Sequence, residues 1–352
     1  EISDRKSRGQ GLTRPELSVL LSYSKLVLFQ QLLDSNVPED SYLSKELVRY
    51  FPQPLQEKYA KVMEGHRLKR EIIATAVTNS MVNRMGATFT LRMTEDTGRT
   101  PAEVAKAYTI AREAVDARGL WAQIDALDGK VPESVQIDAL KTIWSLLRTM
   151  SRWILSRPGA IPEITTAMAR YGEGIKAVRG ALPAVLSDTR RAAYDARLNE
   201  WKGKGVPVAL ATQLAALPTL EFACDIVEIA QSRKLTPMDT AKAFFALGAA
   251  LHLPWLYEQV DALDVDGRWQ ALARGALRDE LGAQQRNLVA QILAGGGKKA
   301  PEAKVEAWMQ RDDSTLRFTM AMLNDLLSQK SLDYPTLSVA ARRLAQLASA
   351  GE

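Results

Sequence analysis

The sequence predicts an all-α protein: an irregular multi-helix bundle or solenoid with an internal duplication of a helical unit. Apolar residues recur with helical periodicity along nearly the whole chain, and no segment shows the alternation typical of a strand. The stretch Thr100 to Asp128 also recurs, without a gap, at Thr236 to Asp264. A supersecondary unit that occurs twice is typical of helical scaffolds built by duplication.

The first long helix is expected to begin at Thr13, where Thr13 and Glu16 have the spacing of a capping box. An acidic turn containing Pro38 should follow, then a segment from Tyr42 to Tyr50 that ends at a pair of prolines. The apolar stripe of the helix that begins at Thr13 is Leu17, Leu20, Leu21, Leu28 and Leu32.

A long helix is expected from about Gly65 to Met85, ended by Gly86. Thr100 and Thr236 each precede a proline and, three residues on, an acid, so each should cap a helix. Further helices are expected over Pro132–Leu155, Pro162–Val178, Pro183–Trp201, Val208–Ala216, Leu220–Gln231, Arg268–Leu293, Pro301–Met309, Leu316–Gln329 and Tyr334–Ala348.

Glycine-rich runs suggest where the chain divides, because they leave the backbone mobile. They are Gly203–Gly205 and Gly295–Lys299. We therefore expect a helical subdomain with the first copy of the repeat over residues 1–202 and a subdomain with the second copy over 203–294. A Gly-rich linker and C-terminal helices should occupy 295–352.

Composition limits the function classes. The chain has 352 residues, of which 46% are hydrophobic and 25% charged, as expected for a soluble protein of roughly two domains. Charged residues interrupt every apolar run before the ~20 residues that span a bilayer, so no membrane partner is expected. The net charge of +5 is spread along the chain without an aromatic-lined basic stripe, which argues against nucleic acid. A single cysteine, Cys224, fits a cytoplasmic location.

The chain begins at Glu1 rather than at Met, and nothing near it has the pattern of a signal peptide. We therefore expect a segment of a longer protein.

The motifs that could bind a cofactor or metal are incomplete. Gly295–Lys298 lacks the Ser or Thr and the following helix of a phosphate loop, so a flexible linker is favoured. Gly172 and Gly174 lack a preceding strand and a third glycine, so no NAD site is expected. Cys224, His66 and His252 have no ligand-like or nucleophile-like spacing, so no metal or catalytic residue is expected.

Paired aspartates offer the best acid–base candidates. Asp125 and Asp128 lie three residues apart and would share one helix face. The pair returns as Asp261 and Asp264, each time where a helix runs into a turn. Two copies of one arrangement favour capping and turn hydrogen bonds over catalysis.

The segment from His66 to Phe89 carries polar side chains on an otherwise apolar face, where Leu68, Ile72 and Val82 share a stripe with Thr75 and Asn79. One interpretation is a buried polar network that fixes the helix against its neighbours. The other is a helix that docks on a domain outside the chain. The residues concerned are Arg67, Arg70, Glu71, Thr75, Asn79 and Asn83.

Several segments resemble the C-terminal region of the large bacterial NAD-specific glutamate dehydrogenases. They are Gly11 to Lys25, Tyr50-Phe51-Pro52, His66 to Phe89, Trp121 to Asp128, Arg152-Trp153 and Asp225-Ile226-Val227.

The resemblance covers essentially the whole chain and implies a parent enzyme that oxidatively deaminates L-glutamate with NAD. In that family the NAD loop and catalytic residues belong to a central domain, so none is carried onto a position here. The resemblance implies that this segment alone binds no cofactor and is inactive, and that its partners are the catalytic domain of the same chain and further subunits of a homo-oligomer. Assembly, support of the catalytic domain or allosteric regulation would be its role. The alternative is an independent α-helical protein-interaction module.

Overall fold

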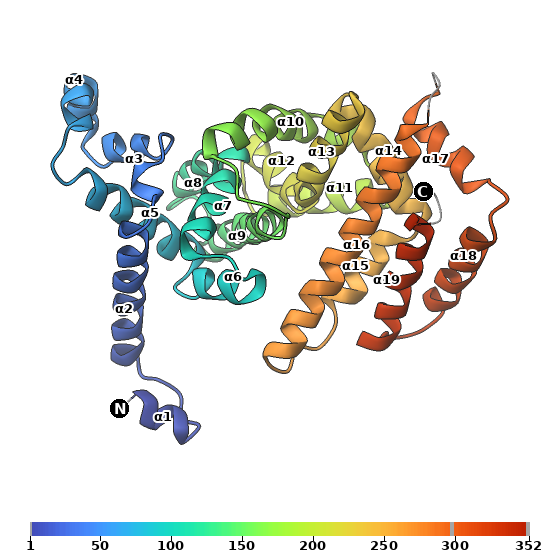
Figure 1. Ribbon diagram of the computed structural model, residues 1–352, viewed down its shortest axis with the longest axis horizontal. Coiled ribbons are helices and arrows are strands. Elements are labelled where there is room, and N and C mark those ends of the chain that lie inside the picture. The colour runs from blue at the N-terminus through green and yellow to red at the C-terminus, as the bar shows by residue number, and fades with distance from the viewer. Residues whose placement is uncertain (1, 296–298, 350–352) are drawn as a thin grey trace. The chain divides into compact units, whose positions relative to one another are not determined.

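The computed structural model describes residues 2–295 and 299–349, and within them every regular element is a helix, as the sequence predicts (Figure 1). The chain forms two compact units. Unit 1 comprises residues 1–118 and 144–170, and unit 2 comprises residues 119–143 and 171–352. These units are interleaved in sequence, whereas the glycine runs suggested three successive segments. That the glycine runs act as linkers stays a prediction. Gly296, Gly297 and Lys298, in the second of those runs, lie outside the described residues.

Unit 1 is built around α5, which contacts α2, α3, α6, α7 and the 3-10 helix η1. Its core includes Leu32, Leu47, Ile73, Met81 and Ile110, all essentially inaccessible to solvent. Its helices are α1 Ile2–Ser7, α2 Arg14–Leu33, η1 Val37–Glu39, α3 Ser44–Arg49, α4 Gln53–Glu64, α5 Lys69–Met85, α6 Phe89–Thr97 and α7 Pro101–Ala114, together with the parts of α8 Ala117–Asp125, α9 Glu133–Leu155 and α10 Ile164–Val185 that fall within its residues.

Unit 2 centres on α14 and α16, which contact each other and both contact α13, α15 and α17. Its remaining helices are α11 Asp188–Gly203, α12 Val208–Ala216, η2 Leu217–Phe222, α13 Ala223–Arg233, α14 Pro237–Ala250, α15 Leu253–Asp261, α16 Arg268–Ala294, α17 Pro301–Met309, α18 Ser314–Leu327 and α19 Tyr334–Ser349.

The two copies of the repeat have the same local structure. The first helices, α7 and α14, each have 14 residues, and the second helices, α8 and α15, each have nine. Thr100 and Thr236 both cap their helices by accepting the backbone N–H three residues on. The connecting residues Asp116 and His252 both adopt a left-handed φ of 53°. These matches agree with a duplication, which remains an interpretation of the sequence.

The boundary between α10 and α11 differs clearly from the sequence prediction. Pro183 was expected to begin a helix, but it lies inside the last turns of α10, which continues to Val185. The next helix begins instead after Ser187, whose extended backbone (φ −63°, ψ 159°) is that of an N-cap residue. Near a helix end the proline removes one hydrogen bond without breaking the helix.

Helix α2 departs from the expected amphipathic pattern. Its start is as predicted, since the Glu16 carboxylate accepts the Thr13 N–H at 2.6 Å. Of the five leucines in its predicted stripe, however, only Leu28 and Leu32 are buried. Figure 1 shows the N-terminal half of α2 extending away from the other helices of unit 1, with α1 at its N-terminal end.

Among the described residues, hydropathy and length alone single out one stretch that could cross a membrane, Val208–Arg233. Glu221 and Asp225 interrupt this stretch, as the sequence analysis expects of every apolar run. Its most apolar window is 78% buried inside the structure, as in the core of a soluble protein.

Gly174 and Gly180 on α10 offer a matched pair of substitutions. A Cβ at Gly174 would lie 2.7 Å from Cγ2 of the buried Val227, whereas a Cβ at Gly180 would meet no atom within 4 Å. We expect Gly174→Ala to lower the free energy of unfolding by about 1–3 kcal/mol through overpacking. Gly180→Ala should raise it by up to about 1 kcal/mol, because alanine favours helix. Urea unfolding measures both, and equal midpoints would contradict the close packing of α10 on α13.

Candidate functional site

The most enclosed charged group in unit 1 is the guanidinium of Arg112 on α7. Helix α7 is buried along most of its length, and the Arg112 side chain is only 1% exposed. An isolated charge at such a position would be very unfavourable unless it were paired and hydrogen-bonded. Its partners therefore define what this part of the protein can do.

Two carboxylates neutralise Arg112. Its Nη2 lies 2.8 Å from Oε1 of Glu46 on α3, and its Nε donates to Oε1 of the adjacent Glu113 at 2.8 Å. Both contacts are charge-assisted hydrogen bonds, which are shorter and stronger than hydrogen bonds between neutral groups. The contact joins two helices whose residues are 66 positions apart in sequence.

Further neutral and charged groups surround Arg112 and its two carboxylates. Ser80 Oγ accepts Arg112 Nη1 at 3.2 Å and lies 2.8 Å from the Tyr108 hydroxyl. Arg118 binds both carboxylates, and the Tyr42 hydroxyl donates to Glu113 at 2.9 Å. We call Arg112, Glu46, Glu113, Arg118, Tyr42, Ser80 and Tyr108 the Arg112 cluster.

The electrostatics of the cluster favour its charged pairs and its neutral phenols. Burial opposes the charge on Arg112, but Glu46 and Glu113 outweigh it and raise its pKa. Burial would raise the pKa of Glu113, yet Arg112 and the Tyr42 hydroxyl hold it below its usual value. Burial and the charge of Glu113 raise the pKa of Tyr42 to about 12, and burial raises the pKa of Tyr108.

This arrangement suits structure better than catalysis. A general acid or base must reach a substrate proton, and an anion-binding arginine must have free donors. In the Arg112 cluster the strongest donors and acceptors already bind each other, and Arg112 itself is sealed from solvent. The cluster therefore acts as an ionic tie between α3, α5, α7 and α8.

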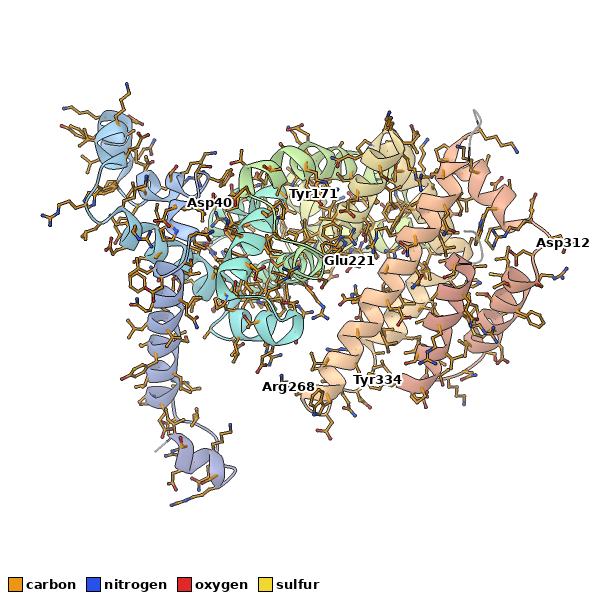
Figure 2. All side chains as sticks on the ribbon, in the orientation of Figure 1. Asp40, Tyr171, Glu221, Arg268, Asp312 and Tyr334 are labelled. Atoms are coloured by element: carbon orange, nitrogen blue, oxygen red, sulfur yellow. The ribbon has the colours of Figure 1, made fainter. Side chains whose placement is uncertain are left out.

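A second buried group surrounds Lys106, one and a half turns earlier on α7. Its Nζ donates to Glu163 at 3.0 Å and lies 3.8 Å from Oδ2 of Asp40, an oxygen with no hydrogen-bond partner among the described residues. Burial raises the pKa of Asp40, whereas the hydrogen bond from Lys106 lowers the pKa of Glu163. Asp40 is labelled in Figure 2.

Five of the residues singled out lie along the partly exposed side of α5, and Arg67 lies just before its first residue, Lys69. Arg67, Arg70 and Asn83 are exposed, and Glu71, Thr75 and Asn79 are half-buried. Two of them hold neighbouring segments: Asn79 accepts Lys25 of α2 at 3.3 Å, and Arg70 pairs with Glu39 of η1.

In the described part of the chain, no hydrogen bond joins any two of these six candidate side chains, from Arg67 to Asn83. Here they do not form one buried network. The docking interpretation remains a prediction.

Cys224 and His252 have the structural surroundings that the sequence suggests, whereas the aspartate pairs differ between the two copies. Cys224 is buried in α13, and His252 occupies the turn between α14 and α15. The Asp128 N–H donates to the Asp125 carbonyl in the turn that ends α8, and Asp261 pairs with Arg278. Among the described residues no group of three or more His, Cys, Asp or Glu side chains could hold a metal ion.

The sequence analysis missed the Arg112 cluster, although the repeat contains a signal for it. The position that aligns with Arg112 in the second copy is Gly248, a large change in both size and charge. A Cβ at Gly248 would lie 2.9 Å from Nε2 of the buried Gln285, which donates to the Phe244 carbonyl. An amide of α16 thus fills in unit 2 the place that a charged side chain fills in unit 1.

The fold is that of an all-α multi-helix domain with a buried ionic cluster. Residues 9–346 match the family described as "Glutamate dehydrogenase, C-terminal". The chain therefore belongs to the glutamate dehydrogenase C-terminal family, which confirms the resemblance found in the sequence.

The similar proteins share one name. The chain is 38% identical to the NAD-specific glutamate dehydrogenase of Pseudomonas aeruginosa, over all of this chain and 22% of that protein. It is 37% identical to the enzyme of that name in Halomonas elongata (99% of this chain, 22% of that protein) and 30% identical to the one in Mycobacterium tuberculosis (99% and 21%). The chain spans about a fifth of the length of these relatives.

Removing the central cation should strongly destabilise unit 1. Arg112→Ala leaves Glu46 and Glu113 buried with less compensation, so we expect a loss of about 3–5 kcal/mol in the free energy of unfolding. Arg317→Ala is the matched control, because its ion pair with Asp312 is largely exposed and should contribute little. Urea unfolding of the two variants should separate them clearly, and similar losses would show that the cluster is not the tie inferred here.

The cluster also predicts a dependence of stability on acid. Because the pKa of Glu113 in the folded state lies below its ordinary value of 4.5, its contribution is complete above pH 4.5. It is lost as the pH falls through the lowered pKa. Glu113→Gln should therefore flatten the fall in unfolding free energy below pH 4.5, and Tyr42→Phe should flatten it in part. An unchanged slope in Glu113→Gln would contradict this.

Proposed function

We propose that this chain is the helical C-terminal part of an NAD-specific glutamate dehydrogenase and supplies none of its catalytic groups. The parent reaction would convert L-glutamate, NAD and water into 2-oxoglutarate, ammonium and NADH. The family match over residues 9–346 and the names of the relatives support this assignment. NAD would bind in the remaining part of the enzyme.

The observation that carries the non-catalytic role is the sealed Arg112 cluster. In it two arginines and two glutamates lie within ion-pairing distance of one another, so these charges are balanced within the cluster. Perturbed ionisable groups often indicate an active site, but ion-pair networks within a scaffold perturb them equally. Here the burial of Arg112 favours the second explanation.

The proposed role is to support the catalytic part of the same chain, within an enzyme that assembles as a homo-oligomer in the cytoplasm. Transmission of allosteric signals is compatible with the same scaffold. The proposed docking of α5 would include its neighbours α2 and η1, because Asn79 and Arg70 hold these two elements on α5. An independent helical interaction module is the alternative from another class of protein.

The experiment is a comparison of three purified proteins: the complete parent enzyme, the enzyme without the segment that matches residues 9–346, and the segment alone. We expect glutamate-dependent NAD reduction by the complete enzyme, its loss or strong reduction in the shortened enzyme, and none in the segment. Activity of the segment alone would refute the non-catalytic role. Full activity of the shortened enzyme would instead refute the supporting role and favour the independent module.

A further inference from the structure

The N-terminal half of α2, from Leu17 to Val27, is an apolar helix that no other described helix of unit 1 covers. We call it the α2 arm. Figure 2 shows side chains on both flanks of this part of α2, without a neighbouring helix of unit 1 beside them. The exposed apolar side chains are Leu17, Val19, Leu20, Leu21, Tyr23, Leu26 and Val27, each between 41% and 63% exposed.

The arm is apolar over most of its circumference, and Ser18, Ser22 and Lys25 form a polar stripe along the remaining side. Leu17 and Leu26 lie about two and a half turns apart, and so on opposite sides of the helix. An ordinary surface helix has a narrower apolar stripe, whereas a helix that is apolar on opposite sides is typical of a largely enclosed position. An occupied arm would therefore be covered on two opposite sides rather than on one face.

The three serine hydroxyls of the arm are already satisfied within the helix. The hydroxyls of Ser18, Ser22 and Ser24 donate to backbone carbonyls of α2 at 2.8–3.0 Å. Water is therefore not required to satisfy these donors, and transfer of the arm into an apolar environment would leave none of them unpaired.

The charges at the two ends of the arm are tied back to this chain. Glu16 pairs with Arg5 at 2.6 Å, and Lys25 donates to Asn79 of α5 at 3.3 Å. No charged residue lies between Glu16 and Lys25. The surface that the arm presents is neutral, so its partner should be apolar rather than oppositely charged.

The arm is also held out on a fixed base. Leu28 and Leu32, in the C-terminal half of the same continuous helix, are buried where α2 contacts α5 and α7. A helix anchored at one end needs little further ordering when its other end is bound, which lowers the entropic cost of binding.

The dimensions and symmetry of the arm discriminate between occupants. At 1.5 Å per residue the arm is about 16 Å long, too short to cross a hydrocarbon core of ~30 Å. A single helix from a second copy would cover one side and leave the opposite leucine exposed. A cleft formed by several elements would cover both sides.

The family supplies a body large enough for such a cleft. Roughly four-fifths of each relative lies outside the part that this chain matches, and the family is a C-terminal one. Helix α2 is the first long helix within the matched residues. We propose that the α2 arm inserts into an apolar cleft of the catalytic part of the same polypeptide. This inference rests on the proposed function and specifies the contact through which support is given.

Side-chain footprinting of the complete parent enzyme with hydroxyl radicals tests this directly. Leu91 on α6 is the internal reference, because it is 58% exposed in unit 1, as much as the arm residues are. We expect Leu17, Tyr23 and Leu26 to be modified severalfold less than Leu91. Modification of the arm as strong as that of Leu91 would overturn the proposal.

Substitutions on the two sides of the arm test for enclosure. In the complete enzyme, Leu17→Asp and Leu26→Asp should each expose the rest of the arm to modification and lower the rate of NAD reduction. Leu91→Asp, a leucine in the first turn of another helix, is the matched control and should do neither. An effect from only one arm variant would indicate a one-sided contact and reject the cleft.

Two other occupants have their own signatures, and either would overturn the proposal. Protection that disappears when the enzyme is diluted to single chains would identify a second copy. Protection that appears only with vesicles of phosphatidylcholine and phosphatidylserine would identify a lipid surface. If deletion of the whole segment abolishes activity while the arm remains accessible, the proposed function stands and the arm inference alone fails.

Discussion

The pairing of Arg112 with Glu46 and Glu113 is the constraint on which unit 1 depends. A guanidinium with 1% exposure is tolerated only where carboxylates approach it at hydrogen-bonding distance, here 2.8 Å from Glu46 and 2.7 Å from Glu113. Satisfying that requirement fixes α3 against α7, and Ser80 extends the tie to α5. Because the hydrogen bonds are directional, they specify one packing of these helices where apolar contacts alone would allow several.

The second copy of the repeat packs its first helix without such a tie. Gly248 replaces the arginine, and the Gln285 amide approaches the helix so closely that a Cβ would meet it at 2.9 Å. The two copies thus share caps, helix lengths and the left-handed connecting residue, but differ in what covers the middle of the first helix. Two copies with the same local backbone can therefore pack against different neighbours.

The sequence predicted what is determined locally. The caps at Thr100 and Thr236 and the bounds of α12 and α17 follow from residues within one turn of each helix end. The predicted end of α10 was wrong, because a proline near the C-terminal end of a helix resembles in sequence a proline that begins one. The Arg112 cluster could not be derived, because Glu46 lies 66 positions from Arg112 and periodicity carries no information about such pairs. Comparison of Arg112 with Gly248 was the available signal, and it indicates a difference without naming the partner.

The exposed half of α2 and the sealed cluster are physically connected. A leucine-rich helix in water is unfavourable unless the complete protein covers it, at roughly 25 cal/mol for each Å² of apolar surface removed from water. For that surface to orient a second body, its base must resist rotation. Lys25 and Asn79 hold α2 on α5, and Ser80, the next residue of α5, accepts Arg112. In the proposed arrangement, the ionic tie would stiffen the helix that carries the arm, and this would be the mechanical role of the buried charge cluster.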